Sequence, residues 1–224
     1  MEKRTETKAS VAVHSSNMAD VYHHSDVIDA RQAMQLLVDG NKRFIANNIL
    51  KKDLSSQKRE ELSKGQKPLA VILTCSDSRV PPELIFDQGL GNIFVIRTAG
   101  NIVDQISLGS IEYGVEHLNA PLLVVMGHEH CGAVKATVDG GEAPGCINAL
   151  INKIKPSVEK VRAAGACGNT LYEQSEDENI YATIADIEKS HIVEHLVAGR
   201  KLKVIGAKYK LDTGEVVFFP DLND

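Results

Sequence analysis

Two short segments of the chain contain side chains that can bind a metal ion. The first holds Cys75, followed closely by Asp77 and Arg79, and the second holds His128 and Cys131. Two thiolates and one imidazole can occupy three corners of a tetrahedral zinc site, and a zinc with a free fourth position is catalytic rather than structural. The sequence therefore predicts a catalytic zinc site with a carboxylate and a guanidinium beside it.

Asp77 and Arg79 are interpreted as an acid–base pair serving this site. Asp77 can accept a hydrogen bond from water or hydroxide on the metal, and Arg79 would orient Asp77 and keep it ionised. Such help is needed because two thiolates cancel the charge of Zn²⁺, which then acidifies its water less strongly than a zinc held by three imidazoles. Asp77 could instead bind the zinc directly as a fourth ligand, and the sequence allows both arrangements.

Short apolar runs predict the strands that position these residues. Three runs rich in β-branched residues are typical of parallel strands covered on both faces: 69–73, 93–96 and 122–126. Helices are expected between them, one starting at Pro81 and one over residues 107–118. Two later runs, 202–209 and 215–219, flank a hairpin turn at Gly214. The predicted fold class is α/β: a mixed, mainly parallel sheet of four strands plus an antiparallel C-terminal edge strand, flanked by helices.

The predicted strands bring the two segments together. Ligands of open α/β sheets collect at the carboxyl ends of strands, where Cys75 and His128 fall. If the first and third strands are neighbours, these two side chains meet at one point. Cys131 falls where a helix would begin, which favours its thiolate form. Gly132 either keeps space beside the metal or allows a close contact between helix and strand.

The amino-terminal part is predicted to be helical. Apolar residues recur at near-helical spacing over residues 26–48 with an interruption at Gly40, which indicates two helical pieces, and residues 55–63 indicate a short surface helix. These form an N-terminal helical arm. Residues 1–25 show no periodicity and are interpreted as a mobile or loosely docked extension of a single catalytic domain over residues 26–224.

Composition restricts the class of protein. With 224 residues, of which 43% are hydrophobic, the chain can bury one substantial core. A formal charge of -5 without a dense Lys/Arg block disfavours nucleic acid or an anionic membrane as a partner. We found neither an apolar run of about 20 residues nor the apolar core of a signal peptide, so a cytoplasmic location is expected. The cysteines are too sparse for a disulfide framework; they are Cys75, Cys131, Cys146 and Cys167.

The chain resembles the β-class carbonic anhydrases. The resemblance rests on the segments that hold Cys75 and His128, and further stretches around Arg43, Arg97 and Tyr113 agree with it. It implies reversible hydration of carbon dioxide to bicarbonate and a proton, one Zn²⁺ per subunit and catalysis by hydroxide on the metal. By resemblance the zinc ligands are Cys75, His128 and Cys131, and the catalytic pair is Asp77 and Arg79.

The same resemblance implies a substrate pocket and an oligomer. The residues expected to line the pocket are Gln66, Phe94, Ala99, Tyr113 and Gly132. The family builds this pocket between two subunits, so a homo-oligomer made from dimers is implied, with carbon dioxide, bicarbonate and inhibitory anions as its ligands. Ile72 occupies the position of a tryptophan found in members with a bicarbonate regulatory pocket, which predicts that this pocket is absent.

Alternatives to this function stay open. Hydrolysis of carbonyl sulfide or carbon disulfide could use the same scaffold, and a non-catalytic zinc or thiol sensor could use the same ligands. His191, Glu194 and His195 match the zinc motif of inverted metallopeptidases, but so little chain follows that an ordinary surface helix is favoured. His117 and His130 are both candidates for carrying the released proton.

Overall fold

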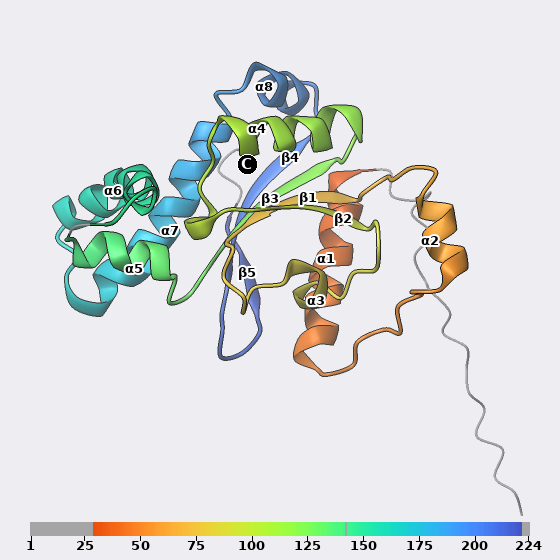
Figure 1. The fold of residues 1–224 in the computed structure, drawn as a ribbon, viewed down its shortest axis with the longest axis horizontal. Coiled ribbons are helices and arrows are strands. Elements are labelled where there is room, and N and C mark those ends of the chain that lie inside the picture. Colours follow the sequence, from red (N-terminus) through yellow and green to blue (C-terminus); the bar gives the residue numbers. More distant parts are fainter. Residues whose placement is uncertain (1–28, 142, 221–224) are drawn as a thin grey trace, which may run out of the picture.

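The computed structural model describes residues 29–141 and 143–220, which form a five-stranded sheet covered by helices (Figure 1). The strand order is β2-β1-β3-β4-β5. Strand β1 pairs in parallel with β2 and β3, β3 pairs in parallel with β4, and β5 runs antiparallel to β4. The predicted mixed sheet is therefore confirmed, including its antiparallel C-terminal edge. The strands are β1 (Ala70–Thr74), β2 (Ile93–Arg97), β3 (Leu122–His128), β4 (Lys203–Tyr209) and β5 (Val216–Phe218).

The helices cover both faces of the sheet. Their bounds are α1 (Ala30–Ile45), α2 (Ser56–Leu62), α3 (Pro82–Ile85), α4 (Gln105–Glu112), α5 (Gly132–Asp139), α6 (Ile147–Ala163), α7 (Gly168–Ile187) and α8 (His191–Ala198), with short turns η2 (Ala99–Asn101) and η3 (Tyr113–His117). Figure 1 shows α1 and α3 on one face and α4 and α8 on the other, with α5 and α6 gathered beyond one end of the strands.

Alternation along the central strands produces two apolar layers. Ile72 and Val124 point into a cluster with Leu37 of α1 and Phe86, while their neighbours Val71 and Leu123 join a cluster on the opposite face. Strand β1 is buried along its whole length, as is β3. These two strands are thus the buried centre of the fold, and both end at the segments that carry the predicted metal ligands.

The prediction of two helical pieces interrupted at Gly40 is wrong, because α1 runs through this position without a break. A Cβ atom at Gly40 would lie 1.8 Å from the carbonyl oxygen of Phe86, so glycine is required for close packing and does not end the helix. The adjacent Asn41 is buried and ties α1 to the rest of the fold. Its amide nitrogen donates to the carbonyls of Ile85 (3.1 Å) and Gly214 (2.8 Å).

Replacing Gly40 with alanine is expected to destabilise the protein by at least about 2 kcal/mol, because the new methyl group collides with backbone that cannot move independently. The matched control is Gly109→Ala in α4, where a Cβ atom meets nothing within 4 Å. That change should be neutral or stabilise by up to about 1 kcal/mol. Urea unfolding of both variants is the measurement, and equal free energies of unfolding would contradict the packing explanation.

The surface helix at 55–63 is confirmed as α2, with Ser55 accepting a hydrogen bond from the backbone nitrogen of Lys58 (3.1 Å). The helix expected at 107–118 is α4, which continues into a wider π-helical turn, η3. The predicted extension at residues 1–25 lies outside the described residues. No helix of the described part of the chain is long and apolar enough to cross a membrane.

Candidate metal centre

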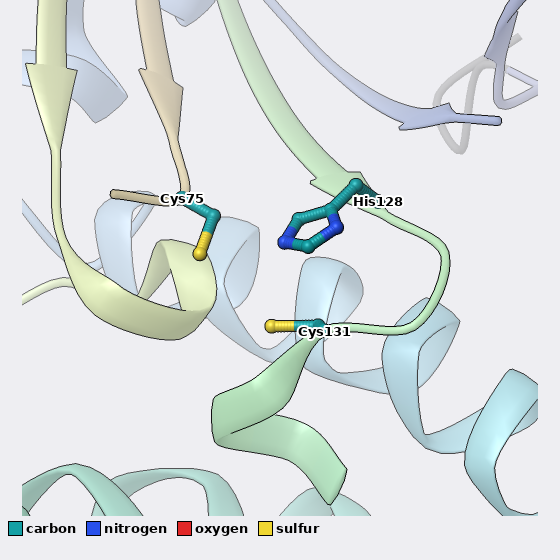
Figure 2. A group of neighbouring side chains, drawn as sticks. All are labelled: Cys75, His128 and Cys131. Atoms are coloured by element: carbon teal, nitrogen blue, oxygen red, sulfur yellow. The ribbon is translucent and has the colours of Figure 1, made fainter. Parts of the chain in front are cut away.

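Three predicted ligands meet where β1 and β3 end. Cys75 directly follows β1, His128 is the last residue of β3, and Cys131 immediately precedes α5. Their candidate ligand atoms all lie within 4.8 Å of one another, and all three side chains are buried. Figure 2 shows the two sulfur atoms and the imidazole directed toward a common point. Because β1 and β3 are parallel neighbours, the convergence predicted from the sequence is confirmed.

The imidazole of His128 is oriented as a metal ligand would be. Its Nδ1 lies 2.8 Å from the carbonyl oxygen of Glu129, and we assign the proton to Nδ1 because a carbonyl can only accept. This leaves Nε2 with a free lone pair. Nε2 is buried and has no hydrogen-bond partner among the described residues. A buried polar atom without a partner destabilises the folded protein, unless a ligand binds to it. Two sulfurs and this nitrogen form a donor set that suits zinc.

The two buried thiols shift each other's pKa in opposite directions. The pKa of the Cys75 thiol is lowered to about 4, chiefly because the Cys131 thiol donates a hydrogen bond to it, and the pKa of Cys131 is raised by the same bond. The backbone nitrogen of Gly100 also donates to the sulfur of Cys75 (3.3 Å). Gly100 has a φ of 74°, a conformation that glycine adopts readily. The site therefore favours one thiolate before any metal is bound.

Asp77 and Arg79 form the ion pair expected from the sequence. Nε and Nη2 of Arg79 donate to the two carboxylate oxygens of Asp77 at 2.9 and 2.8 Å, and the backbone nitrogen of Arg79 adds a third bond of 2.9 Å. The Arg79 side chain is the main reason that the pKa of Asp77 lies well below its usual range. Oδ2 of Asp77 is 3.9 Å from Nε2 of His128, so the carboxylate borders the ligand cluster while Arg79 holds it.

Two of the five predicted pocket residues lie beside the ligands. Ala99 precedes Gly100, whose amide contacts Cys75. Gly132 follows Cys131, and a Cβ atom there would meet nothing within 4 Å. The interpretation of Gly132 as a close helix–strand contact is therefore wrong, and open space remains beside the ligand.

The other three pocket residues lie toward the opposite end of the strands. Phe94 pairs with Val71, four residues before Cys75, which corresponds to about 13 Å along the strand. The ring of Tyr113 has its centroid 6.1 Å from that of Phe94, and the exposed Gln66 comes before β1 begins. The described chain therefore does not bring these three side chains to its own metal ligands.

The rival motif does not form a metal site. His191 and His195 lie on α8 with exposed side chains. Over residues 29–141 and 143–220, no group of three or more histidine, cysteine or acidic side chains converges as a possible metal site other than Cys75, His128 and Cys131. The interpretation of residues 191–195 as part of an ordinary helix is supported.

A family model described as carbonic anhydrase matches residues 70–216, which include all of these ligands. The chain belongs to the carbonic anhydrase family. Carbonic anhydrase 2 of Mycobacterium tuberculosis is 41% identical over 190 residues, covering 83% of this chain and 90% of that protein. The carbonic anhydrase of Mycolicibacterium smegmatis is 40% identical over 198 residues, covering 86% and 94%.

Solved structures identify the class of carbonic anhydrase. The β-carbonic anhydrase of Coccomyxa, solved in complex with acetazolamide, is 29% identical with a TM-score of 0.68, covering 74% of this chain and 78% of that one. A tetrameric β-carbonic anhydrase from Sordaria macrospora is 26% identical with a TM-score of 0.66, covering 72% and 85%. This chain is thus a carbonic anhydrase of the β class.

Arg97 contributes to this carbonic anhydrase site in a way that the sequence did not reveal. It is the last residue of β2, and its guanidinium donates to the carbonyl oxygens of Cys75 (2.9 Å) and Asp77 (2.5 Å). Arg97 therefore fixes the backbone that carries the predicted ligand Cys75 and the carboxylate of Asp77. The sequence did show an arginine at the carboxyl end of an otherwise apolar strand. Its partners could not be predicted, because they are backbone carbonyl groups, which every residue has.

Proposed function

We propose that this chain catalyses the reversible hydration of carbon dioxide to bicarbonate and a proton, with one zinc ion held by Cys75, His128 and Cys131. The observation that supports this most strongly is the buried Nε2 of His128, unpartnered among the described residues and facing two sulfurs beside an Asp–Arg pair. Zinc supplies a hydroxide nucleophile near neutral pH by lowering the pKa of its bound water. The remaining steps belong to the side chains around it.

Asp77 and Arg79 are proposed to orient the attacking oxygen and keep the fourth metal position free. An ionised carboxylate accepts a hydrogen bond, so Asp77 can direct a lone pair of the nucleophile toward carbon dioxide. Arg79 engages both oxygens of Asp77, and these bonds would have to break before Asp77 could bind the metal itself. The arrangement with the pair intact is the one that supports catalysis.

This arrangement is expected to persist in alkaline solution. The pKa of Asp77 is lowered, so the carboxylate stays ionised and paired with Arg79 at every pH above its ordinary value of about 4. A rise in activity through neutral pH would then arise from water at the metal rather than from Asp77. We expect a crystal structure of the zinc protein at about pH 8.5, well above the ordinary pKa of an aspartate, to show Asp77 on Arg79. Asp77 bound to the metal under these conditions would contradict the proposal.

The substrate pocket is proposed to form between two copies of the chain. Carbon dioxide is apolar and needs an uncharged wall, which Phe94, Tyr113 and Ala99 can supply, with the amide of Gln66 as a hydrogen-bond donor. Phe94 and Tyr113 are too far along the strands to reach the ligands of their own chain, which supports a contribution to a neighbour's site and hence an oligomer built from dimers. Bicarbonate and inhibitory anions would bind in the same pocket.

The thiols of Cys75, Cys131, Cys146 and Cys167 are all free, which supports action in the reducing cytoplasm.

His117 and His130 are both exposed, and the ring centroid of His117 lies 5.3 Å from that of Tyr113. Either histidine can carry the released proton to buffer.

The proposal is tested by measuring hydration of carbon dioxide, carbonyl sulfide and carbon disulfide by the zinc-loaded protein in stopped-flow experiments. Carbon dioxide should be hydrated fastest. Faster turnover of a sulfur analogue would favour the alternative reaction on the same scaffold. Zinc-loaded protein that hydrates none of the three would refute catalysis and favour a zinc or thiol sensor, for which the paired Asp77 and Arg79 would have no purpose.

A further inference from the structure

A buried carboxylate outside the ligand cluster contacts the backbone of one predicted zinc ligand. Glu176 lies on α7 and is only 5% exposed. Its Oε1 accepts a hydrogen bond from the backbone nitrogen of Cys131, at 3.2 Å. Cys131 is the residue immediately before α5, and its side chain points to the other two ligands. Glu176 therefore contacts Cys131 through the main chain and leaves its sulfur free.

Glu176 is held in turn by a lysine from the sheet. Nζ of Lys208, on β4, lies 2.9 Å from Oε2 of Glu176 and 2.9 Å from Oδ1 of Asp177, and it donates to the carbonyl of Glu173 at 3.1 Å. Burial alone would lower the pKa of Lys208, but Asp177 and Glu176 outweigh it and raise that pKa. Lys208 therefore gives the buried Glu176 a charged partner that fixes the position of its second carboxylate oxygen.

These contacts fix both ends of the turn between β3 and α5. At one end the backbone nitrogen of Glu129 donates to the carbonyl of Tyr209, at 3.0 Å, on the strand that also carries Lys208. At the other end Cys131 is attached to Glu176. Between them His130 adopts a φ of 53°, a left-handed conformation that is uncommon for residues other than glycine. The direction of the Cys131 side chain therefore depends on anchors outside the turn.

We propose that Glu176 is a positioning residue for the zinc ligand Cys131, and that Lys208 fixes Glu176 in this role. This inference rests on the proposed zinc site. Glu176 touches neither the ligand sulfurs nor Asp77 by any contact found among the described residues; it acts by holding the main chain of Cys131 so that the thiolate is directed at the metal in advance. Groups that orient a metal ligand by hydrogen bonding to its side chain commonly change metal affinity by about 10–100-fold when they are replaced, and this range is the guide for Glu176.

The test compares Glu176→Gln with the matched control Asp177→Asn. A glutamine at 176 has a single oxygen, which can face Cys131 or Lys208 but not both. Asp177 is the next residue of α7 and pairs with the same lysine, yet it has no contact with Cys131 among the described residues. Zinc dissociation constants are measured by competition with a chelator, and cobalt-substituted protein reports thiolate coordination through its absorption spectrum.

We expect Glu176→Gln to weaken zinc binding by about 10-fold or more and to alter the cobalt spectrum, while Asp177→Asn leaves both unchanged. Wild-type affinity in Glu176→Gln, or equal losses in the two variants, would overturn the inference, because equal losses would mean that Lys208 merely joins α7 to the sheet. If Glu176→Gln does not fold by circular dichroism, Glu176→Asp replaces it. Aspartate keeps the charge but is one methylene shorter, and wild-type zinc affinity in that variant would overturn the inference equally.

The outcome is separable from that of the proposed function. Wild-type protein that binds zinc but hydrates no carbon dioxide would refute the catalytic proposal and leave the affinity comparison valid. Wild-type protein that does not bind zinc would refute both. Active wild-type enzyme with an unaffected Glu176→Gln variant would refute only the positioning role.

Discussion

Replacing Cys75 with serine is expected to abolish zinc binding and carbon dioxide hydration together. A serine hydroxyl remains protonated near neutral pH and is a poor substitute for a thiolate, so His128 and Cys131 would be left as two ligands of an incomplete site. Without the metal the whole rate enhancement is lost, and for typical enzymes this is at least about 10⁶-fold. Zinc analysis of the purified variant and stopped-flow hydration measure the two effects.

The matched controls are Cys146→Ser and Cys167→Ser. Both cysteines are free and exposed, unlike the buried Cys75 and Cys131. These controls should keep wild-type zinc content and activity. A fully active Cys75→Ser variant would contradict the proposed site, whereas loss of activity in the controls as well would point to a general effect of removing thiols.

Replacing Asp77 with asparagine is expected to lower the rate of hydration by about 10²–10⁴-fold, the range typical of removing an acid–base group, while zinc stays bound. Asparagine keeps the shape of the side chain but has only one oxygen, and Arg79 now engages two. The amide would rotate or leave Arg79, and the attacking oxygen would lose its charged acceptor. The measurements are kcat near pH 8 and zinc content.

Asp139→Asn is the control for this loss of charge. Asp139 is an exposed carboxylate whose pKa is also lowered chiefly by a neighbouring cation, Lys135, but it lies at the far end of α5 from Cys131. Its replacement should leave the rate unchanged. If Asp77→Asn retained full activity, the proposed role would be wrong, and if it lost zinc as well, Asp77 would be a structural support of the metal site.

The strands and the metal cluster could be predicted because their signals are local. Runs of apolar, β-branched residues indicated β1, β2 and β3. The predicted ligand Cys75 directly follows β1, and the predicted ligand His128 is the last residue of β3. That β1 and β3 are neighbours was a condition the sequence could state but not establish, because strand order depends on packing across the whole sheet. The observed order β2-β1-β3 fulfils it.

Helix α7 shows why other parts were missed. Apolar residues recur at helical spacing only toward its end, at Ile180, Ile184 and Ile187, and polar residues interrupt the rest of its buried face, so the apolar pattern of a core-facing helix is incomplete. The buried polar residues are Ser175, Glu176, Asn179 and Thr183. Asn179 donates to the carbonyl of Gly100 at 2.8 Å, and Glu176 accepts from Cys131. These contacts join residues 79 and 45 positions apart in the sequence, and only the folded chain brings them together.

Gly40 was misinterpreted for a related reason. A missing side chain can mean a helix end or a close contact, and the atom that decides, the carbonyl oxygen of Phe86, belongs to another segment. The glycine was visible in the sequence, but its neighbour was not.

Phe94 lies about 13 Å along the strands from the ligands of its own chain. If each pocket takes its metal ligands from one copy and this aromatic wall from the other, as we propose, then two different defective chains could complement each other. In a mixed dimer of a Cys75→Ser chain and a Phe94→Ala chain, one pocket would carry both defects and the other would carry neither. Two impaired proteins would then regain half of the wild-type sites simply by exchanging subunits.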